Sequence, residues 1–144
     1  MKAYADTGFV VTLYKEESTS EVACDWMSRQ TEAVGLSQFG ELEFRNALRL
    51  AVFRHELTLK EASALQRLFY RDVENGVFLI TPIASAALFA RAMELADRHS
   101  SRFGTRSLDL LHVAAALLSD ADIFLSFDER QRKVAKAEGL KVKP

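Results

Sequence analysis

Four acidic residues lie inside or directly beside apolar segments, where an uncompensated charge raises the free energy of the folded state. Asp6 closes the first strand-like run, and Glu43 lies within an otherwise apolar helical stripe. Asp109 lies in the first turns of an almost wholly apolar helix, and Asp128 directly follows the apolar run 123–127. A chain that keeps carboxylates in such places needs a compensating positive charge. A hard divalent cation with oxygen ligands is the simplest candidate, and it indicates metal-assisted chemistry on phosphate.

The composition is that of a globular protein, since 49% of the 144 residues are hydrophobic and 27% are charged. We expect a single domain spanning residues 1–144. The formal net charge of −1 produces no overall positive field, but arginines supply 12 of the 19 basic residues. Arginine binds phosphate through two parallel hydrogen bonds. We expect about half of these arginines to lie instead on solvated helix faces.

Cysteine content and hydropathy exclude several classes of protein. The single cysteine, Cys24, excludes an internal disulfide and has no second cysteine with which to form a zinc site. No segment resembles a signal peptide, and no apolar run is long enough to cross a membrane. We therefore expect a cytoplasmic protein without a membrane partner.

Short apolar runs alternate with longer segments of helical periodicity, which is typical of an α/β fold. Strands are expected at residues 2–5, 33–36, 77–80, 122–126 and 140–142. Helices are expected at residues 9–14, 18–30, 38–55, 58–74, 83–99, 107–118 and 129–138, with a loop at 100–104. Ser37 is the expected N-cap of the third helix, and Thr58 with Glu61 forms a capping box. Within the second helix, Val22, Trp26 and Met27 are expected on the inner face.

Strands separated by helices of this length require crossover connections, so the sheet should be mainly parallel with helices on both faces. In such sheets the ligand crevice lies beyond the carboxyl ends of the strands. Asp6 and Asp128 fall at that edge. Glu43 follows the second strand by one to two helical turns, and Asp109 lies near the start of its helix. We therefore expect all four carboxylates at one edge of the sheet.

Each carboxylate also has a purely structural interpretation, which the sequence leaves open. Asp6 can accept hydrogen bonds from turn amides, and Asp128 can cap the helix that follows it. Asp109 can stabilise a helix N-terminus, and Glu43 can be paired with a buried arginine.

Two neighbouring polar residues are expected to have structural roles only. Glu41 lies four residues before Arg45, which predicts an exposed ion pair along the helix. His112 lies three residues after Asp109 and is expected to be a hydrogen-bonded packing residue, not a metal ligand.

The segments that carry these residues resemble the PIN-domain family, and in particular VapC-type toxins of toxin–antitoxin pairs. The matching stretches are residues 4–7, 42–48, 107–117 and 125–128, with Ala135 and 139–142 beyond them. The resemblance implies a three-layer α/β/α domain with a parallel sheet of four or five strands, and a ribonuclease dependent on Mg²⁺ or Mn²⁺.

The resemblance also implies the roles of the site residues. Asp6, Glu43, Asp109 and Asp128 correspond to the family's catalytic carboxylates, with Asp6 and Asp109 holding the principal metal ion. Ser126 corresponds to a serine or threonine that supports a metal-bound water. The implied reaction is endonucleolytic hydrolysis of RNA.

The resemblance implies partners as well: an RNA substrate, a cognate antitoxin and a second copy of the chain in a homodimer. Arginines of the 98–106 segment, together with Arg45, Arg49 and Arg54, are candidates for contacts with the RNA backbone. Two other functions stay open. One is a catalytically inactive module of the same fold for dimerisation or RNA binding, and the other is a nuclease that acts on DNA.

Overall fold

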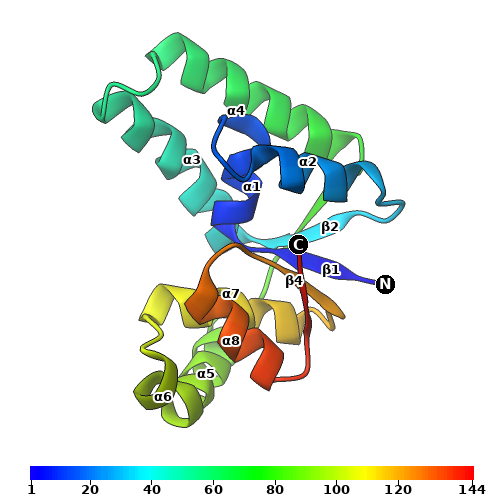
Figure 1. Ribbon diagram of the computed structural model, residues 1–144, viewed down its shortest axis with the longest axis vertical. Helices are drawn as coiled ribbons and strands as arrows, with labels where there is room; N and C mark the ends of the chain where they lie inside the picture. The colour runs from blue at the N-terminus through cyan, green and yellow to red at the C-terminus, as the bar shows by residue number, and fades with distance from the viewer.

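Five parallel strands form one central sheet in the computed structural model, which describes all 144 residues (Figure 1). The strands are β1 (Ala3–Ala5), β2 (Val34–Ser37), β3 (Phe78–Thr81), β4 (Ile123–Leu125) and β5 (Lys141–Lys143), in the order β3-β2-β1-β4-β5. Every strand pair is parallel. The predicted α/β class and the five predicted strands are confirmed, with bounds shifted by one or two residues.

Helices cover both faces of the sheet. They are α1 (Thr7–Tyr14), α2 (Ser20–Ser28), α3 (Gln38–Phe53), α4 (Leu59–Glu74), α5 (Ser85–Leu95), α6 (Ser101–Phe103), α7 (Ser107–Leu118) and α8 (Glu129–Ala137), with a π-helical turn η1 (Ala96–Ser100) between α5 and α6. Helices α1 to α4 lie on one face, and α5 to α8 lie on the other (Figure 1). None of these helices has the length and apolar content needed to span a membrane.

The central strand β1 divides the core in two, because successive side chains of a strand point to opposite faces. Ala3 and Ala5 belong to the apolar cluster beneath α1 to α4, which includes Phe44 and Phe69. Tyr4 belongs to the second cluster, which is formed mainly by α5, α7 and α8. The carboxyl end of β1 is thereby fixed from both sides.

Side-chain caps fix where several helices begin. The Ser37 hydroxyl accepts a hydrogen bond from Gly40 N at 3.0 Å, and Thr58 and Glu61 form the predicted capping box. The first helix, expected from residue 9, instead begins at Thr7 with Asp6 as its N-cap, so no separate turn precedes it. The Asp6 carboxylate accepts a hydrogen bond from a backbone N–H of the first helical turn, which stabilises a helix that begins at the next residue, Thr7.

The second helix is shorter than predicted and has a different inner face. It spans Ser20–Ser28, and Ala23 is its only buried residue. Val22, expected on the inner face, is 50% exposed. Trp26 and Met27 do pack against the core as predicted.

The loop expected at residues 100–104 is also wrong, since the chain stays helical through η1 and α6. It leaves the helical path at Gly104, whose φ of +64° favours glycine. Glu138, at the C-terminal end of α8, contacts the helical segment 96–103. Its carboxylate lies 2.6 Å from His99 Nε2 and 3.2 Å from Arg98 Nη1. These partners are far apart in sequence, so a local pattern does not predict them.

Candidate active site

Asp6 lies at the carboxyl end of β1, between the sheet and the first turn of α1, and is only 2% exposed. One carboxylate oxygen accepts a hydrogen bond from Phe9 N at 2.7 Å, and the other accepts one from the Ser126 hydroxyl at 2.5 Å. Burial raises the pKa of Asp6 despite these two bonds, and the nearby charge of Asp128 raises it further. Asp6 is therefore a carboxylate that a bound cation would favour in its ionised form.

A chain of hydrogen bonds joins Asp6 to two further predicted carboxylates. The Ser126 hydroxyl that donates to Asp6 also accepts from Asp128 N at 3.0 Å. Asp128 caps α8 and accepts from Gln131 N at 2.9 Å. The Gln131 amide then donates to Asp109 Oδ1 at 3.1 Å. Three acidic residues from β1, α7 and the start of α8 are thus connected through Ser126 and Gln131, partly by way of the backbone amides of Asp128 and Gln131.

The structural interpretations of Asp109 and Asp128 also hold, because both residues support helix starts. Asp109 Oδ2 accepts from Arg106 N at 3.2 Å, where α7 begins, and Asp128 is the N-cap of α8. Capping uses one oxygen of each carboxylate and does not exclude a second role for the same side chain.

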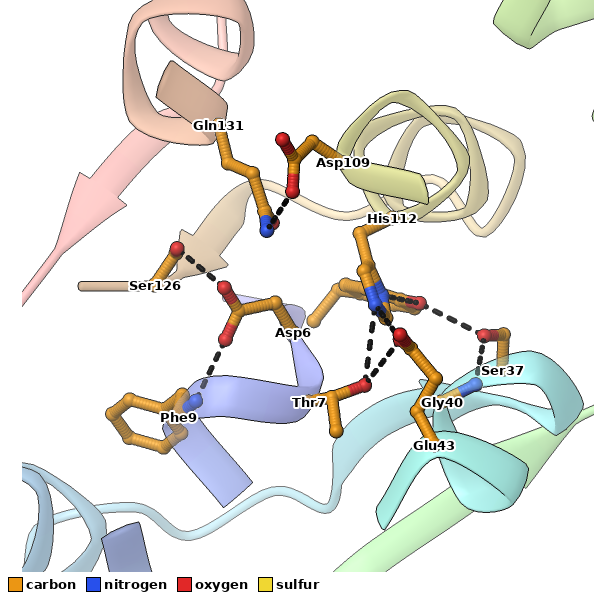
Figure 2. A network of polar contacts seen from close by, with 11 residues as sticks. Asp6, Thr7, Phe9, Ser37, Gly40, Glu43, Asp109, His112, Ser126 and Gln131 are labelled. Atoms are coloured by element: carbon orange, nitrogen blue, oxygen red, sulfur yellow. Dashed lines mark hydrogen bonds and ion pairs between the residues drawn. The ribbon is translucent and has the colours of Figure 1, made fainter. Parts of the chain in front are cut away.

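Glu43 faces the same edge from α3 and is held by two side chains (Figure 2). Thr7 donates to Glu43 Oε1 at 2.7 Å, and His112 Nε2 lies 2.5 Å from the same oxygen. Burial by itself would raise the pKa of Glu43. The hydrogen bonds from His112 and Thr7 outweigh burial, so the pKa is lowered and Glu43 is ionised at neutral pH.

His112 is 3% exposed, and both of its ring nitrogens have polar neighbours. Besides Glu43, Nε2 lies 3.2 Å from the Thr7 hydroxyl, and Nδ1 lies 3.3 Å from the Tyr4 hydroxyl. The prediction of a hydrogen-bonded packing residue is confirmed. The arginine considered as a partner for Glu43 is replaced by Thr7 and His112.

The ion pair expected between Glu41 and Arg45 is wrong. Glu41 instead accepts a hydrogen bond from the Tyr70 hydroxyl at 2.8 Å, and the Arg45 guanidinium lies over the Tyr70 ring at 6.0 Å. Tyr70 comes from α4, so a contact between two helices replaces the pair expected within one helix.

The predicted carboxylates therefore gather at one edge without direct contact between them. Figure 2 shows Asp109 and Gln131 facing Asp6 from one side, and Glu43 with His112 from the other. No group of three His, Cys, Asp or Glu side chains is close enough to hold a metal ion. Neutral hydrogen-bonding groups separate the carboxylates, so an ion here would be held by one or two of them together with water.

Gln131 is a site residue that the sequence analysis missed. Its side chain is 7% exposed, and its carbonyl oxygen Oε1 is buried with no hydrogen-bond partner. Burying an unpaired carbonyl oxygen is unfavourable, which indicates that water or a cation satisfies it. The available signal was periodicity, because Gln131 shares the buried face of α8 with Val134 and Ala135.

The donor set fits a hard, hydrated divalent cation. Its groups are carboxylate, hydroxyl and amide oxygens, which suit Mg²⁺ or Mn²⁺. Mg²⁺ commonly keeps several of its waters and binds through one or two carboxylates. The spacing between the carboxylates and the unpaired Gln131 oxygen agree with such water-mediated binding.

A family model described as PIN domain matches residues 3–137. The chain belongs to the PIN domain family. This PIN domain matches no curated protein sequence. The predicted family and its three-layer fold with a parallel sheet are confirmed.

Several solved structures share the fold of this PIN domain. VapC20 of Mycobacterium tuberculosis, described as a Sarcin-Ricin loop cleaving toxin, has a TM-score of 0.71 at 18% identity, with 99% of this chain and 100% of that chain covered. FitAcB of Neisseria gonorrhoeae has a TM-score of 0.67 at 19% identity, covering 99% and 96%. VapBC2 of Rickettsia felis, bound to a promoter DNA fragment, has 0.68 at 12% identity, covering 99% and 98%. At these identities the likeness establishes the fold.

Proposed function

We propose that this PIN domain is a metal-dependent endoribonuclease and the toxin of a toxin–antitoxin pair. The observation that carries the proposal is the linked set of carboxylates at the carboxyl edge of the sheet, beside the unpaired carbonyl oxygen of Gln131. RNA is the proposed substrate because VapC20, which has the same fold, is described as cleaving the Sarcin-Ricin loop.

In this proposal Asp6 and Asp109 hold a Mg²⁺ or Mn²⁺ ion, and Glu43 and Asp128 complete its surroundings directly or through water. When bound, the ion activates water for attack on the phosphodiester and neutralises negative charge on the phosphate. The protein's own groups keep the carboxylates in place. Ser126 orients Asp6, and the Gln131 amide orients Asp109.

His112 and Thr7 keep Glu43 ionised and fix its direction through their hydrogen bonds. Supporting groups of this kind restrict rotation of a carboxylate that would otherwise sample several rotamers. Burial of Asp6 excludes bulk water from one side of the site, which strengthens its interaction with a cation.

The decisive experiment incubates the purified protein with RNA and with DNA of the same sequence, in Mg²⁺, in Mn²⁺ and in excess EDTA. We expect RNA cleavage that requires the metal and yields 5′-phosphate ends. Cleavage of DNA at the same rate would support the DNA nuclease instead. No cleavage of either, with RNA still bound, would favour the inactive binding module.

Metal binding should also be visible without any substrate. A ligand that binds only the folded state stabilises it by about 2.7 kcal/mol at a hundred times its Kd. We expect Mn²⁺ to raise the melting temperature of the wild-type protein by several degrees and that of the Asp109→Asn variant far less. The matched control is Asp25→Asn on exposed helix α2, which should respond like the wild type. Equal shifts in all three proteins would argue against Asp109 as a ligand.

The hydrogen bond from His112 to Glu43 offers a second test. His112→Leu removes the donor and should lower the rate of RNA cleavage by about 10- to 100-fold, as is typical for groups that orient metal-site ligands. His112→Gln keeps an N–H donor and should retain most activity. We expect the loss in kcat, with KM little changed. Equal losses in both variants would indicate a packing role without any effect on Glu43.

An antitoxin and a second copy of the chain are the proposed protein partners. Support comes from the fold neighbours, which include a toxin–antitoxin complex from Klebsiella pneumoniae with a TM-score of 0.61. Co-expression with the product of the neighbouring gene, followed by size-exclusion chromatography with light scattering, measures both associations. A chain that elutes alone and as a monomer under these conditions would contradict both.

A further inference from the structure

The last 16 residues are strongly basic, although the protein as a whole has a slightly negative net charge. Residues 129–144 contain six basic and two acidic side chains, a net charge of +4, whereas residues 1–128 have a net charge of −5. The overall charge of −1 therefore conceals a strongly basic segment. That segment forms α8, which lies on the same face of the sheet as α7 (Figure 1), and the edge strand β5.

These charges line a groove of about 630 Å³ between α8 and β5. Lys133 and Lys136 lie on the helix side, and Lys141 and Lys143 lie on the strand side. The remaining lining residues are Glu129, Arg132, Leu140 and Val142. Two rows of cations thus face one hollow that contains a single carboxylate, and that carboxylate is already paired with Arg132.

The lysines of this groove lack acidic partners within the protein. No carboxylate lies within 4.0 Å of any of the four, and Lys141 contacts only the Met1 sulfur, at 3.6 Å. By contrast, several of the arginines that the sequence analysis favoured for RNA contacts already have partners within the protein. Arg98 pairs with Glu138, and Arg49 donates to Gln66. The groove is therefore the larger source of unpaired positive charge.

One end of the groove reaches the candidate active site. Arg132 donates to the carbonyl oxygens of Ser126 and Pro144, at 2.7 and 3.1 Å. The amide of Ser126 donates to the carbonyl oxygen of Lys143 at 3.1 Å, while its hydroxyl donates to Asp6. Ser126 is thus the one residue that lies between the basic groove and the buried carboxylate of Asp6, and it is hydrogen-bonded to both.

We propose that the groove between α8 and β5 binds the phosphodiester backbone of single-stranded RNA next to the bond that is cut, an inference that rests on the proposed function. Unpaired lysines bind phosphates as point charges and gain affinity by releasing counterions. Contacts of this kind position a strand without reading its bases. The groove contains no aromatic side chain on which a base can stack, so it holds RNA of any sequence.

The test measures binding of a fluorescently labelled single-stranded RNA in EDTA, where the strand stays intact, over a range of salt concentrations. The variant Lys133→Gln/Lys136→Gln/Lys143→Gln should bind about 100-fold more weakly in 0.1 M salt. Its slope of log affinity against log salt should be smaller by about 2, since each phosphate contact on a single strand contributes about 0.7. The variant with arginine at the same three positions should bind like the wild type.

The matched control removes three exposed cations from α4 on the opposite face of the sheet, as Lys60→Gln/Arg67→Gln/Arg71→Gln. An unchanged salt slope in the control supports the groove. An equal loss of RNA affinity in both triple variants would mean that the net charge of the protein, and not the groove, determines binding. That result would overturn the proposal. Competition by poly-glutamate as effective as that by unlabelled RNA would also overturn it, in favour of an acidic protein partner.

Cleavage kinetics separate this inference from the proposed function. If the wild type cuts RNA and the groove variant shows a raised KM with an unchanged kcat, both stand. If the wild type cuts RNA and the groove variant has wild-type KM and salt slope, the proposed RNA-binding role of the groove is wrong, while the proposed nuclease activity is supported. If the wild type cuts no RNA in Mn²⁺, the nuclease fails, and the binding slopes alone decide whether the groove holds RNA.

Discussion

The Asp6→Asn variant is expected to lose RNA cleavage by about 10³- to 10⁴-fold, because it removes one charge from the proposed metal site. The substitution preserves the shape of the side chain. The asparagine oxygen can still accept from Phe9 N, and its amide can donate to the Ser126 hydroxyl, which has lone pairs to accept it. The loss should therefore occur in a folded protein. It is measured in single-turnover cleavage assays, with circular dichroism to verify the fold.

The same variant should be more stable than the wild type in metal-free buffer. Because burial raises the pKa of Asp6, its protonated form is the one the fold favours. The stability associated with this group is fully present below the pKa of an unfolded carboxyl and is lost as the pH rises through the raised folded pKa. At neutral pH the wild type lacks that stability, whereas the asparagine variant has no charge to bury.

The expected difference in free energy of unfolding is about 1 kcal/mol at neutral pH and smaller near pH 4. Urea unfolding in EDTA at several pH values measures it. Other carboxylates titrate in both proteins, so the difference isolates Asp6. A variant that is less stable than the wild type at every pH would contradict the assigned cost of burying this charge.

The Phe69→Ala variant is expected to show the largest loss of stability, about 3–5 kcal/mol. Phe69 is fully buried, with its ring centroid 4.4 Å from that of Phe44 and 5.7 Å from that of Phe78. The truncation removes buried apolar surface and leaves a cavity between α4, α3 and β3. Aromatic pairs add about 0.5–1.5 kcal/mol beyond their buried area.

Such a loss is a large fraction of the 5–15 kcal/mol typical of a whole domain. Chemical denaturation gives the difference directly. Phe53→Ala is the matched control, since Phe53 is 81% exposed on α3 and should change stability by no more than about 0.5 kcal/mol. Equal effects of the two substitutions would contradict the packing described for Phe69. Because α3 carries Glu43, the Phe69 variant should also lose cleavage activity at temperatures well below its melting point.

Local sequence signals predicted the parts of the fold that depend on neighbouring residues. Helix α7 has the expected bounds, because apolar residues cover nearly its whole circumference. The capping box at Thr58 and Glu61 also formed as expected. The predictions that were wrong concern positions where contacts between distant segments of the chain determine the structure. Glu41 bonds to Tyr70 and not to Arg45, and the helical segment 96–103 contacts Glu138 through His99.

The candidate site shows the same division. The edge at which Asp6, Glu43, Asp109 and Asp128 lie followed from the alternation of strands and helices. Their hydrogen-bond partners did not follow, because Ser126 is 120 residues from Asp6 and His112 is 69 residues from Glu43. Gln131 was not predicted because its role depends on a contact with Asp109 on another helix, 22 residues away. Metal ligation by Asp6 and Asp109 stays a prediction.

Helix α8 connects two distant parts of the molecule. It starts beside Asp128 and Gln131 and ends at Glu138, whose carboxylate is gripped by His99 and two arginines. With a rise of about 1.5 Å per residue, its nine residues span about 14 Å. A helix of this length is nearly rigid, so a shift of Glu138 would also shift Asp128 and Gln131 at its other end. Helix α8 therefore provides a direct structural link between the surface around η1 and the candidate active site.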